Sequence, residues 1–154
     1  IALIGDFTKG FATVGFVKFY SINFSIDDFG IAMAMVAVFL GHLWPIFFNF
    51  KGGKGVATGA GILMGVNIEL GIAVFCSWII VAYTFRYSSL AAVIAGFFSP
   101  LYYWIIFRFD EIFFSILFIG LLLIYRHKKN IYHIMKRVKR VLYISTLLTY
   151  NYIV

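Results

Sequence analysis

The chain has 154 residues, of which 63% are hydrophobic and only 12% are charged, and its mean hydropathy is +0.98. So few charges cannot cover that much apolar surface in water, so the composition excludes an ordinary soluble domain and indicates a protein embedded in lipid. In that setting the formal net charge of +7 favours anionic headgroups or phosphorylated substrates as partners and argues against nucleic acid. The single cysteine, Cys76, excludes disulfides within the chain and leaves Cys/His zinc arrays without ligands.

Apolar runs separated by short polar turns predict an all-α fold, a polytopic membrane helix bundle. We expect about five full spans and one short or re-entrant helix. The stretch 56–85 has 30 residues, too many for one untilted span, and polar Asn67 and Glu69 interrupt it. Its first half, Val56–Val66, would cover only about 17 Å as a helix. The full spans are predicted at about 7–24, 29–48, 70–85, 90–107 and 112–125.

Charge placement predicts which side of the membrane each turn faces. The segment from Arg126 to Arg140 holds seven cations and no acid, so the positive-inside rule places it in the cytoplasm. Counting spans backwards then places the turns at 86–89, 51–54 and 6–9 on the same face. If residues 56–85 formed one helix instead, the turn at 51–54 would lie across the membrane from the basic tail. The opposite side receives five of the six acids, namely Asp27, Asp28, Glu69, Asp110 and Glu111.

The turn Lys51-Gly52-Gly53-Lys54-Gly55 is the strongest candidate for a binding site. Glycines let backbone N–H groups approach an anion, and the lysines add positive charge. A helix that begins at Val56 would direct its partly positive N-terminus into the same space. The turn is not the P-loop of soluble nucleotide hydrolases, because Gly55 follows Lys54 where Ser or Thr would hold magnesium. Taken alone, the turn fits phosphate binding and a plain basic surface loop about equally well.

Four motifs in a fixed order carry a family resemblance. They are Gly41-His42-x-x-Pro45, the segment Phe50–Thr58 that contains the glycine turn, Arg86-Tyr87-Ser88-Ser89-Leu90, and Arg126-His127-x-x-Asn130-Ile131. Together with the opening Gly5-Asp6-x-x-Lys9-Gly10, this set resembles the bacterial membrane acyl-phosphate:glycerol-3-phosphate acyltransferase family. The resemblance covers about residues 1–131, which we expect to form the membrane acyltransferase domain. Residues 132–154 are expected to form a basic and then apolar tail.

The resemblance implies an enzyme of phospholipid synthesis in the bacterial plasma membrane, with its motif loops and basic tail in the cytosol. Such an enzyme transfers a fatty acyl group from acyl phosphate to the 1-hydroxyl of glycerol 3-phosphate and releases lysophosphatidic acid and inorganic phosphate. Its partners would be these two substrates and membrane lipid, and neither a cofactor nor a metal is implied. Acyl phosphate is already activated, so positioning and charge neutralisation would supply most of the acceleration.

The resemblance also implies roles for individual residues. His127 and Asn130, one helical turn apart, would face one direction and hold a phosphate or the attacking hydroxyl. His127 is the best protein candidate for the general base, and proton transfer to the substrate phosphate is the alternative. Ser88 and Ser89 would donate hydrogen bonds to the substrate, and capping of the following helix is the alternative. The substrate phosphate would be bound by Gly52, Gly53, Lys54 and Gly55, with Lys51 adding positive field.

Two features depart from the family pattern. The family's first motif, a Ser-Gly-Asn-x-Gly segment followed by an arginine, is absent from the 154 residues, so we expect the chain to be a piece of a longer protein. After Asn130, the chain has His133, Arg137 and Lys139 where the family usually has arginine, glycine and glutamate. Two other functions therefore stay open. One is a non-enzymatic membrane transporter component for an organic phosphate, and the other is an inactive truncated remnant.

Overall fold

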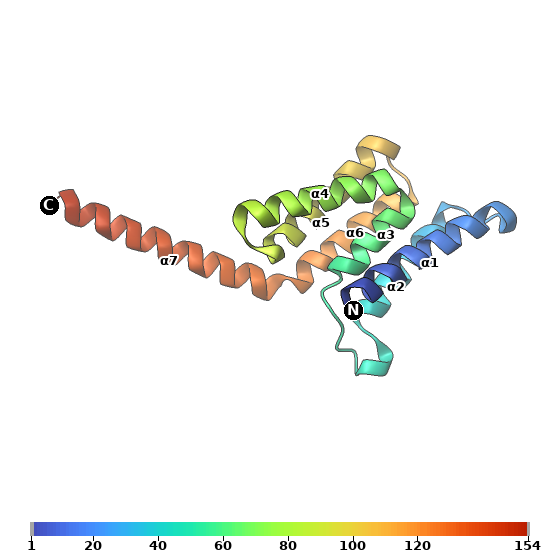
Figure 1. Ribbon diagram of the computed structural model, residues 1–154, viewed down its shortest axis with the longest axis horizontal. Coiled ribbons are helices and arrows are strands. Elements are labelled where there is room, and N and C mark those ends of the chain that lie inside the picture. The colour runs from blue at the N-terminus through green and yellow to red at the C-terminus, as the bar shows by residue number, and fades with distance from the viewer. Residues whose placement is uncertain (1, 154) are drawn as a thin grey trace.

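The computed structural model describes the backbone of residues 2–153 (Figure 1), and the side chains within this range other than those of residues 22, 23, 141, 142 and 144–153. Apolar runs form helices because a backbone in lipid must satisfy its hydrogen bonds within the segment. The described residues form the helices α1 (Ala2–Phe24), α2 (Asp28–Leu43), α3 (Val56–Val66), α4 (Ile68–Phe85), α5 (Ser88–Phe107), α6 (Glu111–Arg126) and α7 (Lys128–Ile153), and the short 3-10 helix η1 (Ile46–Phe48).

The predicted span at 29–48 is interrupted near its end. Helix α2 stops at Leu43, and η1 follows as a separate turn. Pro45 explains the break, because proline has no N–H to donate and disfavours a helical conformation in the residue before it. Trp44 accordingly leaves the helical region with φ −132° and ψ 67°. The consequence is that the connection between α2 and α3 begins at residue 44 and includes η1.

The predicted division between residues 66 and 68 is confirmed. Asn67 has an extended backbone, and its side-chain oxygen accepts a hydrogen bond from the Leu70 N–H at 2.7 Å, which caps the start of α4. Its own N–H donates to the Leu63 carbonyl at 3.0 Å and closes α3. Gly71 lies directly against Met64, so α4 folds back along α3 and the two helices run in opposite directions.

Glycines allow α3 to pack closely on α1. A Cβ at Gly61 would collide with the Phe7 carbonyl oxygen, and one at Gly10 would lie 2.5 Å from the Thr58 carbonyl oxygen. Close approach through small residues is the usual way in which membrane helices associate. The α1–α3 pair joins a core contributed by α1 to α6, whose fully buried members include Val14, Met35, Phe39, Leu43, Ile62 and Leu70.

The fold is a polytopic membrane helix bundle, and its polar turns gather at two ends. Among the described residues, three segments are long and apolar enough to cross a membrane, namely Asp28–Phe48, Ile68–Phe85 and Ser88–Phe107. Helix α1 carries three charged residues, and α6 has 16 residues. In Figure 1 the loop before α3, the α4–α5 turn and the α6–α7 junction lie toward one end, and α7 extends away from the bundle there. Since α7 is continuous from Lys128 to Ile153, the expected domain boundary at 131/132 falls inside a helix and stays a prediction.

Candidate functional site: a glycine loop between two side chains

The loop between α2 and α3 presents backbone N–H groups. From Gly52 to Thr58, none of these groups donates to an acceptor within the described residues, and the first bonded one is Gly59, which donates to the Gly55 carbonyl at 2.8 Å. The N–H groups of the first helical turn are free in any helix and carry its partial positive charge. Here the preceding loop extends that run, and a run of free N–H groups at a helix start is an arrangement that can bind an anion.

Gly55 begins α3 in a conformation that needs glycine. Its φ is +84°, in the left-handed region. A Cβ at this position would also lie 2.6 Å from the Phe39 ring. Because Phe39 is fully buried in the core, the ring has little room to move. The start of α3, and with it the direction of its first N–H groups, is therefore fixed by a packing contact.

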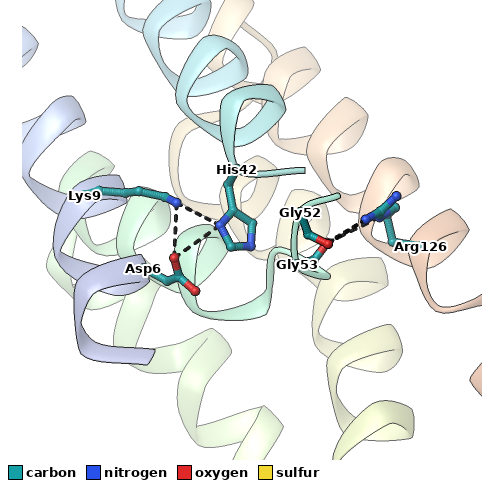
Figure 2. A network of polar contacts seen from close by, with 6 residues as sticks. All are labelled: Asp6, Lys9, His42, Gly52, Gly53 and Arg126. Carbon is teal, nitrogen blue, oxygen red and sulfur yellow. Dashed lines mark hydrogen bonds and ion pairs between the residues drawn. The ribbon is translucent and has the colours of Figure 1, made fainter. Parts of the chain in front are cut away.

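His42 lies between the glycine loop and two charged residues of α1 (Figure 2). Lys9 Nζ donates to Asp6 Oδ1 at 3.1 Å and lies 2.8 Å from His42 Nδ1. His42 Nδ1 also lies 3.3 Å from Asp6 Oδ1, so this nitrogen can accept from Lys9 or, when it carries a proton, donate to Asp6. Asp6, Lys9 and His42 thus form a local polar cluster. They tie the end of α2 to α1 directly beneath the glycines.

Gly52 and Gly53 pack against the end of α2 too closely for any side chain. A Cβ at Gly53 would lie 2.5 Å from His42 Nε2, and one at Gly52 would collide with the carbonyl oxygens of His42 and Leu43. The backbone clash at Gly52 cannot be relieved by a side-chain rotation, whereas the clash at Gly53 involves a ring. Close approach of the backbone therefore requires glycine at position 52, and a Cβ at position 53 would have to displace the His42 ring.

Arg126 holds the other side of the loop. Its Nη2 donates to the carbonyl oxygens of Gly52 and Gly53, each at 3.0 Å, and its Nε lies 3.3 Å from the Gly53 oxygen. Its guanidinium carbon lies 5.6 Å from the centre of the Trp44 ring. From the sequence alone, Arg126 served only as one of the cations that set the membrane orientation and as the first residue of the motif that contains His127. Its place in that motif was the one sequence feature that could have indicated a role at the loop.

Lys54 connects the glycine loop to the beginning of α7. Its Nζ donates to Asn130 Oδ1 at 2.9 Å, and the same ammonium lies close enough to His127 to lower the pKa of that side chain. The structure thus brings together Lys54, His127 and Asn130, three residues that the sequence placed in two separate motifs. They lie where α6 ends and α7 starts.

His127 is held in a neutral form. It is only 2% exposed, and its Nδ1 lies 2.8 Å from the Leu123 carbonyl oxygen. Since a carbonyl only accepts, Nδ1 carries the proton and Nε2 keeps a free lone pair. Burial is the main cause that lowers the pKa of His127 below 6.5; the hydrogen bond to Leu123 opposes the shift, and Lys54 adds to it. The free Nε2 can accept a proton or a hydrogen bond at neutral pH.

The side chains of the three remaining predicted residues, Lys51, Ser88 and Ser89, make no described hydrogen bond. Helix α5 begins at Ser88, and its cap position belongs to Tyr87, which makes no side-chain cap hydrogen bond. Capping by Ser88 or Ser89 is therefore wrong, and no described hydrogen bond joins either serine to the loop. Arg137 of α7 lies 5.9 Å from the Tyr87 ring and connects this turn to the same end of the bundle. Lys51 is exposed.

An apolar cavity of about 550 Å³ opens beside the loop. Val56 and Ala57, the first residues of α3, form part of its wall, and it extends along α3 to α6 as far as Trp78 of α4. Ser99 is its one hydroxyl-bearing lining residue, and that hydroxyl donates to the Gly96 carbonyl at 3.1 Å. A space of this kind suits a hydrocarbon chain. Within the described residues, no three His, Cys, Asp or Glu side chains gather as metal ligands.

Fold and site together define a class: a polytopic membrane protein with a glycine loop of free N–H groups at one end and an apolar cavity beside it. Residues 1–137 match the family model described as glycerol-3-phosphate acyltransferase. The glycerol-3-phosphate acyltransferase of Janthinobacterium sp. (strain Marseille) is 50% identical over 131 residues, covering 85% of this chain and 65% of the relative. That of Herminiimonas arsenicoxydans is also 50% identical over 131 residues, with coverages of 85% and 64%. The chain belongs to the glycerol-3-phosphate acyltransferase family.

Solved structures agree with this membership. Two crystal structures of PlsY (YgiH), an integral membrane glycerol 3-phosphate acyltransferase, resemble this chain at 34% sequence identity and cover 87% of it. The lysophosphatidic acid form has a TM-score of 0.80 and is matched over 67% of its length. The glycerol 3-phosphate form has a TM-score of 0.81 and is matched over 66%. The chain spans slightly less than two thirds of the curated relatives named above.

Proposed function

We propose that this protein transfers a fatty acyl group from acyl phosphate to the 1-hydroxyl of glycerol 3-phosphate, producing lysophosphatidic acid and inorganic phosphate for phospholipid synthesis. One observation carries the proposal: the run of free N–H groups from Gly52 to Thr58 meets the Lys54–Asn130 pair at one end of a membrane bundle. Family membership and the two PlsY structures, in glycerol 3-phosphate and lysophosphatidic acid forms, support the same substrates.

The glycine loop binds the phosphate of glycerol 3-phosphate. Its free N–H groups and the N-terminus of α3 supply hydrogen bonds and partial positive charge, and Lys54 supplies a full charge. A phosphate oxygen is a stronger partner for an ammonium group than an amide oxygen is. The incoming phosphate therefore displaces Asn130 Oδ1 from Lys54, and the released amide becomes available to the glycerol hydroxyls. Lys51 adds field from the exposed side of the loop, and Ser88 and Ser89 donate from the neighbouring turn.

The acyl chain lies in the apolar cavity, with its phosphate end at the loop. In this arrangement the 1-hydroxyl oxygen attacks the acyl carbonyl carbon, the bond from that carbon to the phosphate oxygen breaks, and inorganic phosphate leaves. The hydroxyl proton passes to His127 Nε2, whose lone pair is free because Nδ1 donates to Leu123. No covalent intermediate is required, because acyl phosphate already has a good leaving group.

The site faces the cytosol of a bacterial cell at the plasma membrane. The basic residues of α7 and the loop cations lie at one end of the bundle, and the positive-inside rule places that end inside. A site there receives a soluble phosphate ester from water and an acyl chain from the bilayer. Cysteines introduced at Lys51 and Lys129 should react with an impermeant thiol reagent only from the cytosolic side, and a cysteine at Asp27 only from the opposite side. Labelling of positions 51 and 129 from opposite sides would contradict this arrangement.

The decisive test uses the full-length protein in proteoliposomes, supplied with acyl phosphate and radiolabelled glycerol 3-phosphate. We expect acyl-phosphate-dependent formation of lysophosphatidic acid, lost in Lys54→Ala and His127→Ala and kept in Lys129→Ala, an exposed lysine of α7. Uptake of labelled glycerol 3-phosphate without product would instead favour a transporter component. A protein that showed neither uptake of glycerol 3-phosphate nor formation of product would be an inactive remnant.

A further inference from the structure

Arg126 makes an unusual contact for a cation next to an anion site: it uses its donors on backbone carbonyls. Three described hydrogen bonds run from its guanidinium to the oxygens of Gly52 and Gly53. Figure 2 shows the guanidinium on one side of these glycines and His42 on the other. The loop backbone is thus held between a fork of donors and the wall formed by His42.

The direction of these carbonyls fixes the direction of two N–H groups. In a planar trans peptide, the C=O bond and the N–H bond of the next residue point in opposite directions. When the oxygens of Gly52 and Gly53 face Arg126, the N–H groups of Gly53 and Lys54 face away from it. Glycine has no Cβ to restrict rotation, so these peptide planes need an external restraint.

We propose that Arg126 is a positioning residue, which orients the Gly52–Gly53 and Gly53–Lys54 peptide planes so that their N–H groups stay directed at the phosphate. This inference rests on the proposed function, since it takes the loop as the phosphate site. Stacking on Trp44 restrains the guanidinium before substrate arrives. Because Arg126 is the last residue of α6 and His127 follows it, the same contact sets the distance between the loop and the His127–Asn130 turn.

The test compares Arg126→Gln and Arg126→Lys with Arg137→Gln in the full-length protein. Arg137→Gln removes the same charge from α7 but has no described contact with the loop. We expect KM for glycerol 3-phosphate to rise on the order of tenfold or more in Arg126→Gln, with a smaller change in kcat. Arg126→Lys should restore little, because an ammonium group keeps the charge but lacks the fork that reaches two carbonyls. Arg137→Gln should resemble the wild type.

A second measurement needs no catalysis. In the ligand-free protein, trypsin should cleave after Lys51 and Lys54 several times faster in both Arg126 variants than in the wild type, while cleavage after Lys129 stays the same. This arm tests the loop restraint even if the wild type makes no lysophosphatidic acid, a result that would refute the proposed function separately. Wild-type KM in Arg126→Lys would show that charge alone matters and would overturn the positioning role. Unchanged loop cleavage in both Arg126 variants would overturn it equally.

Discussion

Lys54 and Asn130, 76 residues apart in the chain, are joined by a hydrogen bond of 2.9 Å from Nζ to Oδ1. This contact turns two sequence motifs into one site. It gives the glycine loop a polar partner on α7 and places a full positive charge at the edge of the free N–H groups. In the proposed function an incoming phosphate competes for that charge, so we expect the removal of Lys54 to affect binding most directly.

Replacing Lys54 with methionine should therefore raise KM for glycerol 3-phosphate by about 10- to 100-fold, the usual range for a lost charged hydrogen bond. Folding stability should hardly change, because an exposed pair contributes little. Lys51→Met is the matched control, since the Lys51 side chain is exposed and has no described partner. Its effect should be only a few-fold. Steady-state kinetics and thermal unfolding check both variants. An equal rise of KM in Lys54→Met and Lys51→Met would contradict the specific role of Lys54, because it would show that only the total positive charge of the loop matters.

The protonation of His127 should limit activity on the acid side. Its pKa is lowered below 6.5, chiefly by burial, so the imidazole is neutral at pH 7 and becomes charged only as the pH falls through that lowered value. The profile of kcat/KM should therefore decline below pH 6.5 as Nε2 loses its lone pair. The neutral imidazole also stabilises the fold above pH 6.5, and this contribution should disappear in the same acid range.

His127→Gln decides between the two candidate proton acceptors. If the variant loses most of its activity and the remaining kcat/KM no longer declines at acid pH, His127 is the proton acceptor. If the decline of kcat/KM at acid pH persists in the variant, it reports the substrate phosphate, whose second pKa lies near 6. In that case, the substrate takes the proton and His127 serves only to orient it.

Much of the fold was predictable because hydropathy and helix breakers act locally. The short helix Val56–Val66 and the break at Asn67 follow from sequence alone, since a polar residue inside an apolar run can cap a new helix. Pro45 also indicates an interruption of the helix, yet the span was predicted to continue to residue 48. Proline at position 45 removes a hydrogen-bond donor from the helix, and the three residues after it form only a 3-10 turn.

The site was predictable in its parts and not in its assembly. The free N–H groups follow from the glycines and the start of α3. The contacts of Arg126 with the loop span 73 and 74 positions of the chain, and no local pattern indicates which carbonyls a cation will reach. Ser88 and Ser89 could not be separated from a capping role by sequence, because serine is common in both settings.

Lys18 should stabilise α3 from its far end. Its ammonium donates to the Val66 carbonyl, one of the oxygens that the end of a helix leaves without a partner, where positive charge is also favourable. Lys18→Met should cost about 0.5–1.5 kcal/mol and lower the midpoint of thermal unfolding, with KM for glycerol 3-phosphate unchanged. Lys18→Arg should keep most of the stability. A large change in KM would show instead that the far end of α3 controls the loop.

The most direct test of the anion-binding loop compares two glycine substitutions in the full-length protein. A Cβ at Gly52 meets the carbonyl oxygens of His42 and Leu43, whereas one at Gly41 meets nothing within 4 Å. Calorimetric binding of glycerol 3-phosphate in lipid nanodiscs should be lost in Gly52→Ala and unchanged in Gly41→Ala. Wild-type affinity in a folded Gly52→Ala variant would show that the phosphate binds elsewhere.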